Sequence, residues 1–301
     1  MNTDPHDRRT FLARIGLLGA VAGAGALLPG AVASPGARAA SGARAASDPL
    51  LGLVNTALAE LARDTLNGLA VFVVPGPDAY SAAQGTRRDE PGAMEANTPD
   101  FLIESLDNYV PVPDQLAGPL ASALANGLAD VDVPLPDGLR PLPTGELLDL
   151  DQAVRTLLRN DETVPLSLVI ALLLNSLATL VNPAAVGGAF LSPFARLSFA
   201  EKAEAFRMME EPAAGLVSAI DDELSGPLQG TASGLLEFIA GALLEFSAFG
   251  TYCEWSTFDP ASLSVTSTPV GWRLSGYDPG VIDGWDEFQG YYQGRKEVSA
   301  R

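Results

Sequence analysis

Residues 164–181, VPLSLVIALLLNSLATLV, form the most hydrophobic stretch of the chain after its N-terminal segment. The longest uninterrupted apolar run is only Leu168 to Leu174, and Pro165, Asn175 and Thr179 interrupt the rest. A helix that crosses a bilayer needs about 20 apolar residues and is usually flanked by basic ones, which this stretch lacks. We therefore interpret it as the central helix of a bundle, apolar on all sides because other helices surround it.

Several further segments carry helix signals. Asp48-Pro49 has the chemistry of a helix start, and Leu51, Val54, Leu58 and Leu61 follow at three- and four-residue spacing, which predicts a helix of about 15 residues. Residues 69–74 favour β structure, and we expect an extended buried segment there, with a single strand as the alternative. Helices are also predicted at 113–128 and 147–159, from Thr98-Pro99, from the capping box Ser198-Phe199-Ala200-Glu201 to Met209, and at 233–249. In the last of these, one apolar face is formed by Leu236, Ile239, Leu243 and Phe246.

These patterns predict a mainly α fold. We expect one helical domain over residues 48–301, an irregular bundle with a buried central helix and a non-helical, loop-rich aromatic tail at 251–301.

The N-terminus resembles a twin-arginine export signal. Arg8-Arg9-Thr10-Phe11-Leu12 precedes the small and apolar run Ile15–Leu28, and Ala31-Val32-Ala33 has the small-x-small pattern that signal peptidases cut. We expect a signal peptide at 1–33, with Arg8, Arg9, Phe11 and Leu12 recognised by the twin-arginine translocase. An ordinary secretory signal and a retained N-terminal anchor are the alternatives. The predicted location is outside the cytoplasmic membrane, and no transmembrane span is expected in the mature chain.

A low-complexity spacer follows the signal. The sequence GARAAS occurs twice in succession, from Gly36 and from Gly42. Such composition is typical of a disordered linker, which we place at residues 34–47.

Composition excludes several kinds of chemistry. The formal charge is −19, which disfavours binding to nucleic acid or to an anionic membrane. His6 is the only histidine and lies in the expected signal, so histidine-based triads and histidine-ligated metals are not predicted. Cys253 is the only cysteine, and no nucleotide-binding glycine motif occurs in a suitable context. We therefore assign no catalytic, cofactor-binding or metal-binding residue.

Carboxylates are abundant without forming a recognisable site. The main groups are Asp130 and Asp132, Asp149 and Asp151, Glu210 and Glu211, and the run 221–223, and we interpret them as solvated helix ends. Nothing in their spacing identifies the acid–base pair of a glycosidase or a calcium loop. An enzyme that uses carboxylates alone remains open as a minor alternative.

The C-terminal tail concentrates the large aromatic residues on glycine-rich loops. All three tryptophans and four of the six tyrosines follow residue 250. Aromatic side chains on loops favour interfaces, because each has an apolar body and a polar tip. Two interpretations stay open: contacts to a partner protein, or a cover for the helical core. The candidate partner contacts are Tyr252, Trp255, Trp272, Tyr277, Trp285 and Tyr291.

Two segments resemble recurring segments of the gluconate 2-dehydrogenase subunit 3 family. One is PGAMEANTPDFL at residues 91–102 and the other is FARLSFAEK at residues 194–202. Residues 271–292 are similar to the tail of longer members. Asn97 stands where the family often has glycine, and asparagine also tolerates positive φ.

The resemblance implies a function. Members are small twin-arginine-exported subunits of flavin-dependent dehydrogenases of the glucose-methanol-choline class, in which the large subunit holds FAD. The chain is then expected to be a non-catalytic accessory subunit that assists the folding and export of a larger flavoprotein. The alternative function is a free-standing exported helical binding protein with an apolar ligand between its helices.

Overall fold

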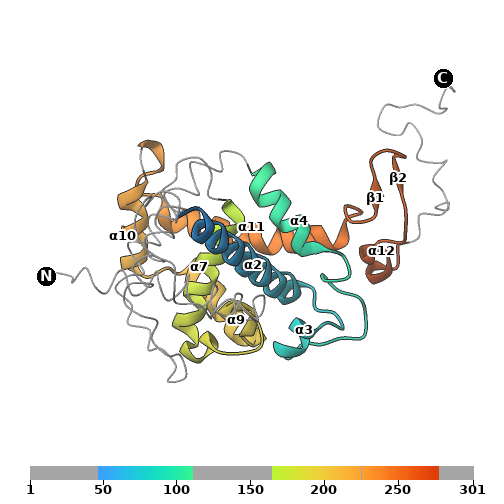
Figure 1. Ribbon diagram of the computed structural model, residues 1–301, viewed down its shortest axis with the longest axis horizontal. Coiled ribbons are helices and arrows are strands. Elements are labelled where there is room, and N and C mark those ends of the chain that lie inside the picture. The colour runs from blue at the N-terminus through green and yellow to red at the C-terminus, as the bar shows by residue number, and fades with distance from the viewer. Residues whose placement is uncertain (1–46, 111–164, 225, 278–301) are drawn as a thin grey trace, which may run out of the picture.

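A computed structural model of the chain describes residues 47–110, 165–224 and 226–277, and these form a mainly helical bundle (Figure 1). This confirms the predicted fold class. The first half contributes α2 (Ser47–Val73), α3 (Ala79–Ala83) and α4 (Thr98–Glu104), which continues as the π-helical turn η1 (Ser105–Tyr109). The second half contributes α7 (Leu166–Val181), η3 (Pro183–Val186), α8 (Pro193–Arg196), α9 (Phe199–Glu210), α10 (Ala214–Glu223), η4 (Gly226–Leu228) and α11 (Ala232–Tyr252).

Helix α7 is the buried centre that its sequence predicts. Every side chain from Leu166 to Thr179 is buried, and the helix packs against α2, α8 and α9. Its polar residues find partners inside the bundle. The Asn175 amide donates to the Thr65 hydroxyl and the Ala171 carbonyl, while its oxygen accepts from the Ser192 hydroxyl and the Phe194 amide. Buried polar groups are tolerated when they are hydrogen-bonded in this way.

Helix α2 is longer than predicted, and the expectation of an extended segment at 69–74 is wrong. The helix runs over 27 residues to Val73, and the backbone amide of Val74 still donates to the Ala70 carbonyl. Leu69, Ala70 and Val71 are all buried. A short apolar run cannot be assigned to strand or buried helix by periodicity alone, and here the run continues the helix until Pro75 follows.

Helix α4 begins as predicted, immediately after Asn97, whose φ of 52° places it in the left-handed region. The helix then widens into η1. Asp107 in η1 accepts hydrogen bonds from the Ser167 amide and hydroxyl, at 2.8 and 2.9 Å, and so caps the N-terminus of α7. The π turn is therefore anchored to the central helix.

The predicted capping box is confirmed at the start of α9. The Ser198 hydroxyl accepts from the Glu201 amide, and the Glu201 carboxylate accepts from the Ser198 amide. Asp221, one of the carboxylates in the acidic run 221–223, accepts from the amides of Gly230 and Ala232 and thus satisfies donors at the start of α11. These carboxylates serve helix termini.

Residues 254–277 leave α11 and form what we call the arm. The arm holds the antiparallel strands β1 (Phe258–Asp259) and β2 (Ser264–Val265), paired in the register Phe258↔Val265 and Asp259↔Ser264, and the short helix α12 (Val270–Ser275). Figure 1 shows these elements beyond the C-terminal end of α11, away from the bundle. The expectation of a wholly non-helical tail is therefore wrong at α12, which follows Pro269 and ends at Gly276 in the left-handed region.

Several predictions lie outside the described residues. These are the signal peptide 1–33, the linker 34–47 except for Ser47 at the start of α2, the helices at 113–128 and 147–159, the carboxylate pairs at 130–132 and 149–151, and the tail after residue 277. They stay predictions.

Within the described part of the chain, α11 is the one helix with the length and apolar composition that a membrane span needs. A core helix of a water-soluble protein also meets this test, and one third of its most apolar window is buried in the fold. The side chains of Leu236, Ile239 and Leu243 point into the hydrophobic core, as their spacing predicts.

Candidate functional site

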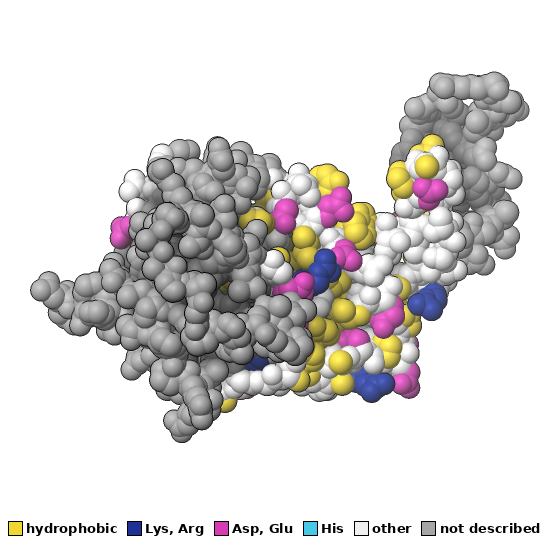
Figure 2. Space-filling model, viewed as in Figure 1, with side chains coloured by type: hydrophobic (Ala, Val, Ile, Leu, Met, Phe, Trp, Pro, Cys, Tyr) yellow, Lys and Arg dark blue, Asp and Glu magenta, His cyan; other side chains and the backbone are white. Residues whose placement is uncertain are grey.

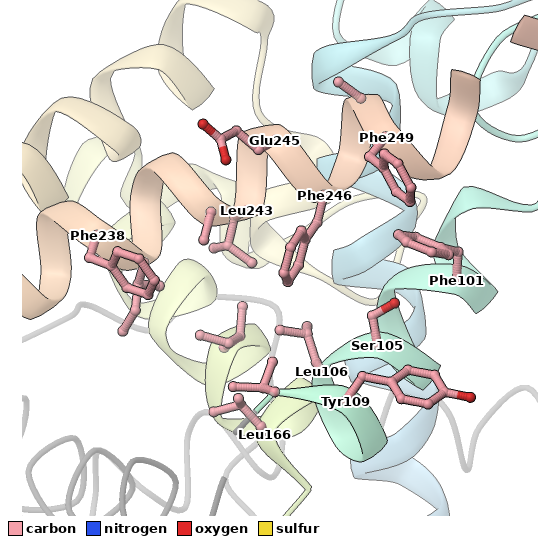
Figure 3. Close-up of a pocket in the computed structure, with 15 residues that line it drawn as sticks. Phe101, Ser105, Leu106, Tyr109, Leu166, Phe238, Leu243, Glu245, Phe246 and Phe249 are labelled. Atoms are coloured by element: carbon pink, nitrogen blue, oxygen red, sulfur yellow. The ribbon is translucent and has the colours of Figure 1, made fainter. Parts of the chain in front are cut away.

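A groove between α4–η1 and α11 has the character of a binding site (Figure 3), and we call it the α4–α11 groove. It has a volume of about 790 Å³, within the usual range of ligand sites. Leu106, Ile170, Leu243 and Phe246 are among the residues that line it. The first residue of α7, Leu166, lies at its lower edge in Figure 3.

Aromatic rings stand at the two ends of the groove. Phe238 lies at one end, and Phe249 lies at the other, facing Phe101 (Figure 3), with ring centroids 5.7 Å apart. Phe238 is 69% exposed and Phe249 is 61% exposed. The two α11 residues are eleven positions apart, which corresponds to a length of about 16 Å along a helix. The groove is therefore elongated, and much of its apolar surface is open to solvent.

Few polar groups face the groove. Glu245 belongs to its lining, but Figure 3 shows the carboxylate on the side of α11 that is turned away from Leu243 and Phe246. The Tyr109 hydroxyl also points outward and donates to Glu104 at 3.3 Å. The Ser105 hydroxyl remains at the Phe101 end, and it makes no hydrogen bond within the part of the chain that the structure describes.

Ser105 is the first residue of the π turn. Three of the five residues of η1, Ser105, Leu106 and Tyr109, line the groove. Single π turns inside α-helices occur frequently at functional sites, because the wider backbone re-aims side chains. Serines elsewhere in this fold behave differently: Ser176 and Ser247 each donate to the carbonyl four residues earlier.

The arm is the second feature with functional character. Of the predicted partner contacts, Tyr252, Trp255 and Tyr277 are exposed to solvent, and Trp272 is half-buried. Trp272 donates from its indole nitrogen to Glu254 at 2.7 Å and meets the Tyr277 ring edge-on at 5.2 Å. The structure therefore brings four of the predicted contacts into one region at the end of α11. Trp285 and Tyr291 lie outside the described residues.

The arm also exposes apolar residues that the sequence analysis did not single out. Phe258 lies in β1, and Leu263 lies in the hairpin turn, 77% exposed, with a φ of 53° in the left-handed region. A branched apolar residue rarely adopts this conformation. Asp259 fixes the turn, because its carboxylate accepts from the Ala261 amide and from the Ser262 amide and hydroxyl.

Close backbone contact holds the arm to α11. A Cβ at Gly271 would lie 2.2 Å from the Tyr252 carbonyl oxygen, so only glycine fits there. In addition, the Trp255 ring packs edge-on against Phe101 at 5.7 Å. Trp255 thus packs in part on the body of the protein, while Tyr252 and Tyr277 are more exposed. Contacts to a partner protein stay a prediction.

A polar cluster lies on the other side of the bundle, between α2, α3, α8 and α9. Asp64 accepts from the Tyr80 hydroxyl at 2.5 Å and from the Ser192 amide at 2.7 Å. Burial and the hydrogen bond to Asp64 raise the pKa of Tyr80. Burial lowers the pKa of the nearby Arg196, and the charge of Asp64 opposes this effect. These side chains join α2, α3 and α8 to one another.

Lys202 is the most unusual member of this cluster, because its side chain is completely buried. Its ammonium donates to the Gly68 carbonyl at 2.9 Å and to Gln84 Oε1 at 2.7 Å, and lies 5.5 Å from the centre of the Phe194 ring. Burial lowers the pKa of Lys202 to about 7, and the charges of Asp78 and Asp64 act in the opposite direction. Lys202 belongs to the segment 194–202 that carries the family resemblance.

The described residues offer little for metal binding or for thiol chemistry. They contain no cluster of three or more histidine, cysteine or acidic side chains with metal-site geometry. Cys253 is half-buried, and desolvation raises the pKa of its thiol, which disfavours the reactive thiolate. The export residues Arg8, Arg9, Phe11 and Leu12 lie outside the described ranges.

The sequence pattern predicts a single apolar face on the helix at 233–249, and three of its residues line the groove, but the two exposed rings at the ends of the groove were not predicted. Phe238 and Phe249 fall outside the stripe Leu236, Ile239, Leu243 and Phe246. A second apolar stripe on one helix is the signal that could have found them.

Comparison of the chain with protein-family models, with curated proteins and with solved structures finds no match.

Proposed function

We propose that this chain is a non-catalytic accessory subunit that binds a larger flavin-dependent dehydrogenase of the glucose-methanol-choline class and assists its folding and export. FAD belongs to the partner in this proposal. The observation that carries it is the set of exposed aromatic and aliphatic side chains on the arm and the last turn of α11: Tyr252, Phe258, Leu263 and Tyr277. Exposed apolar clusters on a folded protein are typical of interaction sites.

The construction of the arm supports a docking role. Gly271, the Trp272–Glu254 hydrogen bond and the β1–β2 pairing hold the arm in one arrangement before any partner arrives. A surface that is ordered in advance loses less conformational entropy on binding. Figure 2 shows apolar and acidic side chains side by side over the described part of one face, with few Lys or Arg. Protein interfaces commonly combine apolar and polar side chains.

The family resemblance and the export signal give the partner its class. The twin-arginine route carries folded proteins, so a companion without its own signal can be exported by attachment. The segments 91–102 and 194–202 include the start of α4 and the capping box of α9. The Thr98 hydroxyl lies 2.8 Å from the Thr251 hydroxyl, so the first of these segments is joined directly to the end of α11 that bears the arm.

The test is co-purification of a flavin-containing polypeptide with the exported chain, followed by native mass spectrometry and an absorbance scan. Changing both Arg8 and Arg9 to Lys is expected to retain the flavoprotein in the cytoplasm. Normal export of the flavoprotein in the absence of this chain would contradict the proposal.

Arm variants locate the contact. Phe258→Ser combined with Leu263→Ser is expected to release the flavoprotein without unfolding the chain, because both residues are exposed. Phe238→Ser is the matched control, since it also removes an exposed phenylalanine but lies in the groove and away from the arm. Equal loss of partner with both variants would argue against the arm as the docking surface.

The second candidate function is a free-standing exported binding protein for an apolar ligand. The α4–α11 groove favours it, because its volume and apolar lining match those of small-molecule sites. Monomeric behaviour of the exported protein, with a bound apolar molecule in native mass spectra and no flavoprotein, would support this function over the first.

A further inference from the structure

We propose that the α4–α11 groove binds a single elongated, uncharged apolar molecule that carries one hydroxyl or carbonyl group, with that group placed at Ser105. This names the ligand class for the second function above, on which it rests, and it does not require the accessory role.

The charge of the lining excludes ionised ligands. Among the described residues that line the groove there is no Lys or Arg, and the single carboxylate, Glu245, is directed away from the cavity (Figure 3). A carboxylate or phosphate group would therefore lose its hydration without gaining a cationic partner, which is strongly unfavourable. Glu104 and Asp107 on the adjacent α4–η1 segment add to this, because their negative charge repels anions.

The shape of the groove favours an elongated molecule. The distance of about 16 Å between the levels of Phe238 and Phe249 on α11 corresponds to roughly three helical turns. Apolar side chains from α7 and η1 line the groove between these ends. A straight hydrocarbon chain or a fused-ring skeleton can contact the rings at both ends, whereas a compact polar metabolite would leave most of this surface uncovered.

Ser105 gives the ligand its orientation. Its hydroxyl is at the Phe101 end of the groove, and within the described residues it has no hydrogen-bond partner. It belongs to the π turn, whose anchorage to α7 through Asp107 holds it in place. A ligand hydroxyl or carbonyl at this end would pair with Ser105, while the apolar body extends toward Phe238.

The test uses the purified exported chain and two probes of equal length, 1-decanol and decanoate, titrated by calorimetry at neutral pH. We expect saturable 1:1 binding of 1-decanol and binding of decanoate that is weaker by roughly tenfold or more, because the carboxylate must be desolvated. No binding of 1-decanol, or equal binding of the two probes, would overturn the proposal.

Variants of the groove sharpen the test. Ala242→Trp fills the groove and is expected to abolish binding of 1-decanol, whereas Gly241→Trp places the same side chain on α11 where nothing lies within 4 Å, and should bind normally. Ser105→Ala is expected to weaken 1-decanol binding by roughly 2- to 12-fold, the effect of one hydrogen bond, and Ser105→Thr to restore it. Wild-type affinity in Ala242→Trp would refute the site.

Two other possible occupants of the groove, a membrane surface and a different apolar molecule, can be tested with the same purified chain. Co-sedimentation with neutral phosphatidylcholine vesicles that is lost in Phe238→Ser, without a calorimetric response to 1-decanol, would indicate a membrane surface and overturn the proposal. Failure with 1-decanol and a different apolar molecule in native mass spectra would overturn the ligand class while leaving the binding-protein function intact.

Discussion

The buried ammonium of Lys202 makes the stability of the fold depend on pH. Replacing it in the variant Lys202→Met removes the charge while keeping an unbranched side chain of similar length. In the wild type, burial holds the pKa of this amine at about 7 against an ordinary value of 10.5. Well below pH 7 the amine is protonated in both the folded and unfolded states, and it contributes no pH dependence there.

Above pH 7 the unfolded chain binds a proton that the folded chain does not. The free energy of unfolding therefore rises with pH through the interval between the two pKa values. Each pH unit well inside this interval is worth about 1.4 kcal/mol, but the folded amine still holds half a proton at pH 7, so the gain between pH 7 and pH 9 is about 2 kcal/mol. In Lys202→Met this gain is absent. The variant also leaves the Gly68 carbonyl and Gln84 Oε1 without their donor, at a cost of about 1–3 kcal/mol each at any pH.

The assay is urea unfolding of the wild type and of Lys202→Met at several pH values from 6 to 9. The difference between the two proteins at each pH cancels the contribution of Cys253 and the tyrosines, which both share. We expect this difference to change by about 2 kcal/mol in favour of the wild type as the pH rises from 7 to 9. Parallel stability curves for the two proteins would refute the reasoning.

The pKa of the Lys202 amine can also be measured directly, because the chain has only two lysines, Lys202 and Lys296. In a ¹³C-lysine NMR titration, the resonance lost in Lys202→Arg should titrate near neutral pH in the wild type. Titration of that resonance near 10 would show that the buried ammonium is solvated or paired more effectively than its surroundings indicate.

Three further predictions concern the packing of the helices. Gly68→Ala places a Cβ 2.7 Å from the Ala195 backbone and is expected to destabilise the fold by about 1–3 kcal/mol. Gly215→Ala, in open space on α10, should be neutral or slightly stabilising. Both variants are measured by thermal unfolding. Asp221→Ala removes the acceptor at the start of α11 and should cost about 1 kcal/mol in the same assay, and a change below a few tenths would exclude this capping role. Asn175→Leu leaves the buried Ser192 hydroxyl and the neighbouring amide without their acceptor, so we expect a loss of at least about 2 kcal/mol in urea unfolding, and unchanged stability would contradict the assigned network.

Local signals predicted the parts of the fold that depend on a few neighbouring residues. The capping box at Ser198 and Glu201, the start of α4 after Asn97, and the buried helix at 164–181 all follow from short patterns. Each of these patterns satisfies backbone groups or buries apolar surface by itself, so no long-range contact is needed to recognise it.

The parts that were missed depend on contacts between distant residues. Residues 69–74 are helical because α2 is surrounded there, and the Val71 carbonyl accepts from Gln84, thirteen positions further on. Lys202 is buried only because Gly68 and Gln84 meet it from two other elements. The α4–α11 groove forms where η1, α7 and α11 pack together. These segments are far apart in the sequence, so no local pattern predicts the groove.

The backbone contact between Gly271 and Tyr252 restricts which sequences can preserve the arm. In a saturation mutagenesis screen that selects for an intact arm, position 271 should accept glycine alone. Neighbouring Trp272 and Leu274, which are only half-buried, should accept other large apolar residues. Acceptance of glycine alone at this position would show that the backbone contact with Tyr252 holds the arm against α11. No measurement of partner binding is needed for this test.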